Sequence, residues 1–200
     1  MRDAIMRQME RSRREVEVKL PFESTSEARQ KLAALGAELI HDRRFEDNLL
    51  YDREGAPLAS AGKLLRLRRD GPRALLTYKA PVPGRHVHKV RLEEETELAD
   101  ADAMERVLDG LGYVPVYRYQ KFRTLLELDG VHICLDETPI GCYVELEGEP
   151  EGIDRLAARL GFGPDRYVVE SYLELHAKQA AARGEPRGDM VFEADEGAGE

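Results

Sequence analysis

Ionisable side chains of both signs recur at every second position in several short segments of the chain. In the first segment, Glu15, Glu17 and Lys19 alternate with valine and leucine. Because side chains of a β-strand alternate between its two faces, these three charges share one face. Lysine and arginine bind phosphate oxygens through charge-assisted hydrogen bonds, and carboxylates supply the hard oxygen ligands that Mg²⁺ and Mn²⁺ prefer. The combination predicts a site for a polyanion together with a divalent metal.

The same alternation returns later in the chain. It occurs in Leu64–Arg69, Leu75–Lys79, Lys89–Glu95, Lys121–Arg123 and Val144–Glu147, and Asp136 closes the segment Val131–Asp136. One such strand is typical of a half-buried sheet with its polar face in water. Together these faces are almost purely ionisable, so we interpret them as the lining of a closed barrel, whose apolar faces point outward beneath helices. Because each desolvated charge needs a partner, the lining indicates a highly charged ligand.

The candidate site residues divide by charge. The predicted phosphate-binding residues are the basic ones: Lys19, Arg66, Arg68, Lys79, Lys89, Arg91, Lys121 and Arg123. The predicted metal ligands are the carboxylates: Glu15, Glu17, Glu93, Glu95, Asp136, Glu145 and Glu147. We predict that Lys19, Lys79 and Arg123 are catalytic, because cations in these positions would neutralise charge that develops on phosphate oxygens.

The ordered motifs resemble those of the CYTH superfamily, also called triphosphate tunnel metalloenzymes. The motifs are ExExK at 15–19, LRxR at 65–68, TYK at 77–79, RxExE at 91–95, KxR at 121–123, Asp136, and ExE at 145–147 after Gly141. The resemblance covers about residues 14 to 176. It implies an α+β fold with a closed antiparallel β-barrel, the triphosphate tunnel, which has a charged interior and is covered by helices. It also implies a Mg²⁺ or Mn²⁺ cofactor and a triphosphate-containing substrate.

Two activities remain open within this family. A triphosphatase needs only phosphate binding and a positioned water, whereas a class IV adenylate cyclase must also hold a nucleoside in one conformation. We therefore predict hydrolysis of a nucleoside, organic or inorganic triphosphate, with the cyclase reaction, ATP to cyclic AMP and pyrophosphate, as the alternative. The segment Phe45–Asp52 resembles bacterial sequences grouped with the cyclases. A non-catalytic polyphosphate- or nucleotide-binding module is disfavoured, because all the carboxylates are present.

Composition narrows the class of protein further. The 200 residues suit one domain. The net charge of −9 argues against a nucleic-acid partner. The chain has no apolar run long enough for a membrane span and no signal peptide, so we expect a cytoplasmic protein without membrane contact. We expect Cys134 and Cys142 to be reduced packing residues. The family resemblance makes a homodimer an open possibility.

Local patterns predict the elements around the barrel. Helical spacing of apolar residues predicts helices over Glu27–Leu35, Asp102–Leu111, Ile153–Leu160 and Val168–Lys178, and loops over Glu54–Gly62 and Pro81–His88. We expect His86 and His88 to be exposed loop residues outside the site. We divide the chain into an N-terminal extension (1–13), a CYTH domain (14–178) and a flexible acidic tail (179–200). We expect the tail to be flexible because it has few apolar residues whose burial would offset the entropy lost on ordering.

Overall fold

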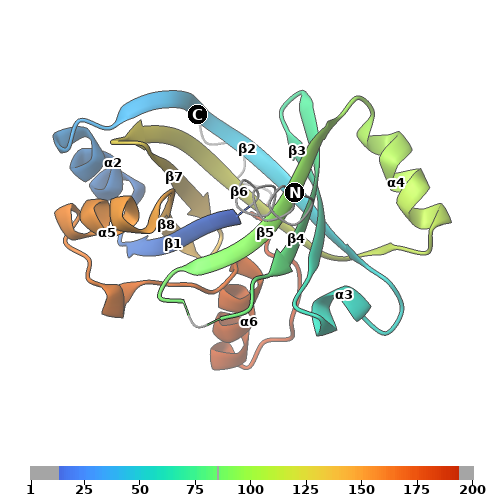
Figure 1. Cartoon of the computed structure of the whole chain (residues 1–200). Helices are drawn as coiled ribbons and strands as arrows, with labels where there is room; N and C mark the ends of the chain where they lie inside the picture. Colours follow the sequence, from blue (N-terminus) through green and yellow to red (C-terminus); the bar gives the residue numbers. More distant parts are fainter. Residues whose placement is uncertain (1–13, 85, 194–200) are drawn as a thin grey trace, which may run out of the picture.

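The computed structural model describes residues 14–84 and 86–193, so the predicted extension 1–13 lies outside the described residues. Within these ranges, eight antiparallel strands close into a barrel in the order β1-β5-β4-β3-β2-β6-β7-β8 (Figure 1). This confirms the predicted α+β fold with a closed barrel. The strands are β1 (Arg14–Phe22), β2 (Glu38–Asp52), β3 (Leu64–Asp70), β4 (Arg73–Pro81), β5 (Lys89–Leu98), β6 (Val114–Leu128), β7 (Val131–Thr138) and β8 (Gly141–Glu147).

Strand register brings the charged motifs together. β1 lies between β5 and β8, so Glu17 has Lys89 as its partner on one side and Glu147 on the other. Two residues along β1, Lys19 is paired with Glu145. Because all neighbouring strands are antiparallel and in this register, the charged faces turn to the same side of the sheet, which is the barrel interior.

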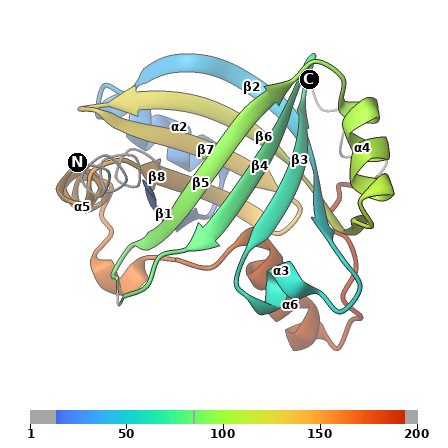
Figure 2. The same ribbon diagram turned by 45° about the vertical axis from the view of Figure 1, so that its right-hand side comes forward.

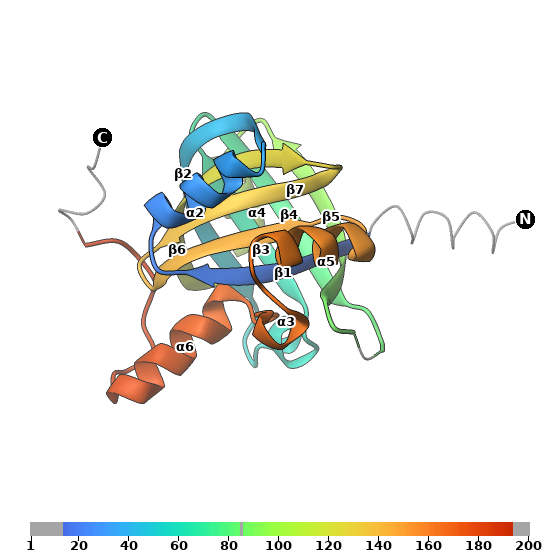
Figure 3. The same cartoon turned by 90° about the vertical axis from the view of Figure 1, so that its left-hand side faces the viewer.

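Apolar residues between these charges form a core on the outside of the barrel. The helices α2 (Thr25–Ala34) and α5 (Pro150–Arg159) lie across β1, β7 and β8 (Figure 3). Beneath them the buried side chains include Val18, Leu20, Ile133, Val144 and Leu146. The helix α2 begins directly after Ser24, two residues before the predicted start at Glu27, because the Oγ atom of Ser24 accepts a hydrogen bond from the backbone N–H of Glu27.

A third covering helix, α4 (Ala101–Gly110), lies against the outer side of β2 and β3 (Figure 2). Leu108 of this helix packs with Tyr51 and Leu67. The predicted loop after β2 contains the short helix α3 (Pro57–Ser60), whose first turn is capped by Asp52 through the N–H groups of Leu58 and Ala59. None of the helices in the described ranges is both long and apolar enough to cross a membrane.

The chain beyond β8 differs from the expected flexible tail. After α5 and the short 3₁₀ turn η1 (Pro164–Arg166), helix α6 runs over Tyr172–Arg183, past the predicted boundary at 178. Met190 is only 1 % exposed, and its backbone pairs with that of Arg118 and Gln120. The physical reason is an open edge: β2 occupies one side of β6, whereas β7 joins the other side only from Phe122 onward. Residues 194–200 lie outside the described ranges.

Candidate active site

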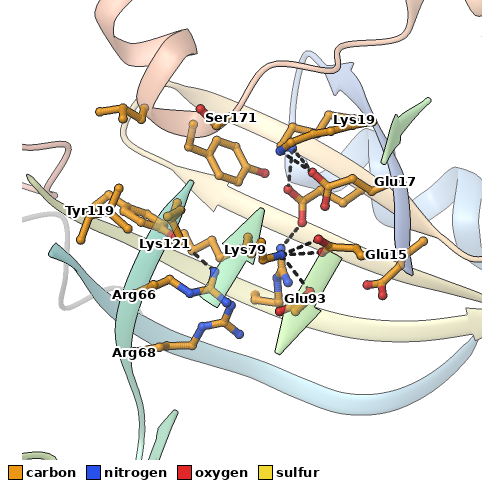
Figure 4. A pocket seen from close by; sticks show the side chains of 18 of the residues that line it. Glu15, Glu17, Lys19, Arg66, Arg68, Lys79, Glu93, Tyr119, Lys121 and Ser171 are labelled. Carbon is orange, nitrogen blue, oxygen red and sulfur yellow. Dashed lines mark hydrogen bonds and ion pairs between the residues drawn. The ribbon is translucent and has the colours of Figure 1, made fainter. Parts of the chain in front are cut away.

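The barrel interior contains a cavity of about 340 Å³ (Figure 4). Its walls include every predicted site residue except Arg91 and Asp136. The predicted residues that line it are Glu15, Glu17, Lys19, Arg66, Arg68, Lys79, Lys89, Glu93, Glu95, Lys121, Arg123, Glu145 and Glu147. We call this space the front chamber. Its six carboxylates come from the adjacent strands β8, β1 and β5, so acidic groups are concentrated on one side of the chamber.

Lys19 is the most enclosed cation of the front chamber. It is 2 % exposed, and its Nζ atom lies 2.9 Å from Glu17 Oε1 and 3.1 Å from Glu145 Oε1. Burial alone would lower the pKa of Lys19, but Glu145 and Glu17 outweigh it and raise the pKa well above its ordinary value. Burial would raise the pKa of Glu17, but Lys19 and Lys89 hold it far below the usual range. Each of these two shifts favours the charged form of its group.

Lys79 is shared between two carboxylates. Its Nζ atom lies 2.6 Å from Glu15 Oε2 and 3.0 Å from Glu93 Oε2, and Figure 4 shows it between them. Burial, together with repulsion from Glu17, raises the pKa of Glu15 to about 7. Burial also raises the pKa of Glu147, although Lys79 acts in the opposite direction. Acidic groups are thus less well neutralised here than around Lys19, which makes this end of the chamber attractive to a further cation.

The opposite wall is basic and comes from β3 and β6. Arg66 donates from Nη1 to Tyr119 Oη over 3.2 Å and from Nη2 to Thr77 over 3.1 Å. Beside it, Arg68 donates to Asn48 over 3.2 Å. Guanidinium groups held by such partners are already oriented for planar recognition of phosphate oxygens.

Asp136 lies behind the chamber wall and does not line it. This carboxylate is 0 % exposed and accepts hydrogen bonds from Lys121 at 2.9 Å, from Arg123 at 2.6 Å and from the Tyr172 hydroxyl at 2.7 Å. With its oxygens occupied by these donors, Asp136 orients the two cations and the phenol. Asp136 was predicted to be a metal ligand, but its carboxylate does not reach the front chamber.

Arg91 also differs from its expected place. Its Nη2 atom donates to the backbone carbonyl of Gly62 over 2.9 Å, in the loop that precedes β3. Arg91 lies on the same face of β5 as the other charged residues. However, it is paired with Pro81 at the end of β4, where its side chain reaches the neighbouring loop. The guanidinium thus contacts the rim of the barrel.

Sequence patterns missed several residues of the tunnel. Tyr119 of β6 and Tyr172 of α6 line the front chamber, and Glu46 of β2 is 3 % exposed beside it. Burial would raise the pKa of Glu46, but Lys121 and Arg68 hold it far below the usual range. Glu46 and Asn48 do alternate at period two, but the remaining residues of β2 mix charged and apolar types, so this signal was weak.

The two loop histidines lie on the outside of the barrel, and only His86 is exposed as expected. The side chain of His88 is 11 % exposed, and its Nε2 atom lies 2.8 Å from Asp154 Oδ1 of α5. The same carboxylate oxygen accepts a hydrogen bond from Tyr167 over 2.9 Å. The two cysteines, Cys134 and Cys142, are free thiols.

A closed antiparallel barrel with paired cations and carboxylates inside defines the class of tunnel-type barrel domains. The CYTH domain profile matches residues 13–159, and the chain belongs to the CYTH family. No curated protein matches the chain.

Three solved structures show the same fold. A candidate adenylate cyclase from Vibrio parahaemolyticus is 22 % identical, with a TM-score of 0.71 over 82 % of this chain and 97 % of the other. The PH1819 protein of Pyrococcus horikoshii is 27 % identical, with a TM-score of 0.69 over 82 % of this chain and 99 % of the other. A Hippeastrum protein, named as a candidate adenylyl cyclase with a dominant triphosphatase activity, is 21 % identical, with a TM-score of 0.57 over 87 % and 97 % of the two chains.

Proposed function

We propose that the protein is a metal-dependent triphosphatase, which hydrolyses a nucleoside, organic or inorganic triphosphate in the front chamber. The observation that supports this most strongly is the convergence of lysines and arginines on one enclosed cavity together with carboxylates of neighbouring strands. A triphosphate carries several negative charges along a short chain, so it can exchange places with the carboxylates as the partner of these cations.

The basic residues have distinct roles in this proposal. Lys19 and Lys79 enter from β1 and β4 on the acidic side, whereas Arg123 enters from β6 on the basic side. Phosphate bound between them contacts cations from both directions. Charge that develops on the phosphate oxygens is then neutralised by groups already in position, which is the main way a protein accelerates phosphoryl transfer.

The carboxylates fit a divalent metal by their chemistry. Burial and mutual repulsion raise the pKa of Glu15 to about 7, which means that this group is short of a cation. No three His, Cys, Asp or Glu side chains of the described residues are grouped tightly enough to hold a metal alone. Mg²⁺ is commonly bound by one or two carboxylates, phosphate oxygens and water, so a bound triphosphate would supply part of its ligands.

Glu15 and Glu17, with Glu145 and Glu147, are the residues that would hold the metal. When bound, it would supply Lewis-acid polarisation of the phosphate and further charge neutralisation. The predicted ligands Glu93 and Glu95 line the same chamber and remain candidates. Asp136 is better suited to orienting Lys121 and Arg123, because it is fully buried and does not line the front chamber.

A class IV adenylate cyclase is the second candidate. Leu64 and Leu173, with the ring of Tyr172, add apolar surface to the front chamber, and such surface could contact an organic group attached to the phosphates. The name of the Vibrio structure points the same way, whereas that of the Hippeastrum structure favours hydrolysis. Hydrolysis places fewer demands on the site, because only water has to be positioned.

Phosphorus NMR of the reaction products tests the proposal. The purified full chain is mixed with ATP, and separately with tripolyphosphate, in Mg²⁺ or Mn²⁺. Orthophosphate from either substrate supports a triphosphatase, and cyclic AMP with pyrophosphate would replace it by a cyclase. The Lys19→Met variant, purified in parallel, controls for a contaminating phosphatase. No turnover of either substrate would contradict both enzymatic candidates.

A further inference from the structure

A second cavity, of about 320 Å³, adjoins the front chamber inside the barrel. The two cavities share Arg68, Glu95, Arg123 and Glu147 in their walls. We call the second cavity the rear chamber and these four residues the collar. The lining of the rear chamber combines charged residues, among them Arg44 and Arg73, with the apolar side chains of Leu75 and Leu125. A phosphate group held at the collar can therefore be approached from two sides.

In the part of the chain that the structure describes, two buried carboxylate oxygens of the rear chamber accept no hydrogen bond. They are Glu46 Oε2 and Asp70 Oδ1, which belong to directly paired residues of β2 and β3. A buried carboxylate oxygen normally has a donor, because desolvation without one is costly. Both residues line a cavity that is large enough for water, and a water molecule there can donate to their carboxylate oxygens.

Glu46 is linked to the front chamber, and Asp70 is not. Glu46 Oε1 lies 3.2 Å from Arg68 Nη1, and Glu46 Oε2 forms an ion pair with Lys121 Nζ at 3.5 Å. Both cations also line the front chamber. The nearest cation to Asp70 is Arg44, at 3.7 Å, on the rear side only. A water molecule on Glu46 would therefore lie immediately behind the cations that bind phosphate.

We propose that Glu46 is a catalytic residue that holds the attacking water in the rear chamber and accepts its proton. This inference rests on the proposed triphosphatase function. The water oxygen forms a bond to the terminal phosphorus while the bond from that phosphorus to the bridging oxygen breaks. The electron pair of the broken bond leaves with the diphosphate portion into the front chamber, and one water proton passes to Glu46.

The arrangement explains how one carboxylate can remain ionised before the reaction and accept a proton during it. In the free protein, Arg68 and Lys121 stabilise the charge of Glu46. When phosphate binds, these cations are shared with it, and the negative charge of the phosphate makes protonation of Glu46 more favourable. Nucleophile and leaving group also occupy opposite chambers, as an in-line displacement requires.

Steady-state kinetics of Glu46 variants test the inference in the metal-loaded full chain with tripolyphosphate. We expect Glu46→Gln to lower kcat by about 100-fold or more, the usual contribution of a positioned base. Binding of the non-hydrolysable imido analogue of tripolyphosphate should be unchanged or tighter, because one negative charge is removed. Added formate should partly restore turnover of Glu46→Ala. The matched control, Asp70→Asn, removes a carboxylate from the same chamber and should keep kcat near that of the wild type.

The outcomes separate the alternatives. Unchanged kcat in Glu46→Gln overturns the inference but leaves the triphosphatase function standing. If kcat and analogue binding fall together and formate does not restore turnover, Glu46 only positions Arg68 and Lys121. This result also overturns the inference. If Glu46→Gln does not fold, Glu46→Asp takes its place, with the same expected loss of kcat at unchanged analogue affinity. A wild-type chain that releases no orthophosphate overturns the proposed function itself.

Discussion

The two faces of the same strands differ in the side chains that they contact. Lys19 and Leu20 are neighbours in β1, and both are almost fully buried, but Lys19 contacts carboxylates inside the barrel while Leu20 packs with apolar side chains outside it. Burial of apolar surface contributes about 25 cal/mol per Å² to stability. Buried ion pairs add little net stability, because the cost of desolvating the two charges offsets the attraction between them. The comparison teaches that the outer face supplies most of the stability of the barrel, whereas the charged inner face adds little to it.

The balance of positive and negative charge differs between two parts of the inner face. The cluster around Lys19 is balanced, because Glu17 and Glu145 both keep a cation within hydrogen-bond distance. Around Glu15 the balance fails, since Lys79 also serves Glu93. Substitutions at the two places should therefore change stability in opposite directions.

The largest effect is expected on activity from Lys19→Met. Removal of this cation should lower kcat/KM by about 10²–10³-fold, because a preorganised group that stabilises developing charge is lost. Two carboxylates lose their shared partner, so stability should also fall, by about 3–5 kcal/mol. Kinetics and urea unfolding measure the two effects. Lys31→Met on the exposed surface of α2 is the control. Near-normal kcat/KM in folded Lys19→Met would contradict the role in activity assigned to the inner face.

On the outer face, Leu146→Ala should change stability alone. Leu146 is 0 % exposed, and removal of such a side chain costs about 2–5 kcal/mol. Its neighbour Glu145 lines the front chamber from the same strand, so a marked loss of kcat per folded molecule would show that the two faces are coupled. Urea unfolding and kinetics below the transition are the measurements. Val116→Ala, at a side chain that is 55 % exposed, should leave both quantities unchanged.

Glu15→Gln should stabilise the metal-free protein at alkaline pH. The folded-state pKa of Glu15 is raised from 4.5 to about 7, so between these values the folded state holds the proton more tightly than the unfolded state. Stability therefore falls as pH rises through this window, by at most about 3 kcal/mol. The variant should lose this part of the pH dependence and melt higher above pH 7. Thermal melts from pH 4 to 8 in EDTA measure it, and identical curves for both proteins would contradict the prediction.

The smallest effect is expected outside the barrel, at His88. Loss of its contact with Asp154 in His88→Ala should lower stability by about 0.5–1.5 kcal/mol, the usual range for one hydrogen bond. The analogue of tripolyphosphate should bind as in the wild type, because His88 does not line the chamber. Calorimetric titration and urea unfolding check both statements, and weakened binding would show that the β4–β5 loop positions Lys89.

Much of the inner face could be predicted, because period two in a strand needs no knowledge of the fold. Charges at 15, 17 and 19 must share a face in any sheet, and the order of the motifs indicated the family. Asp136 and Arg91 obeyed the same alternation, but one is covered by Lys121, Arg123 and Tyr172, and the other is captured by the carbonyl of Gly62. Such contacts join residues that are distant in sequence, so no local pattern reveals them.

The C-terminal segment and the rear chamber depend even more on the fold. The composition after residue 178 suggested a flexible tail, but Met190 is buried against β6 because that strand has an unpaired stretch next to β7. By itself the sequence determined which face of each strand carries charge, where the first helices begin and to which family the chain belongs, because alternation, capping and motif order are local. Only the tertiary structure decided which charges reach the cavity and which are covered, because strand pairing and loop contacts set distances between remote parts of the chain.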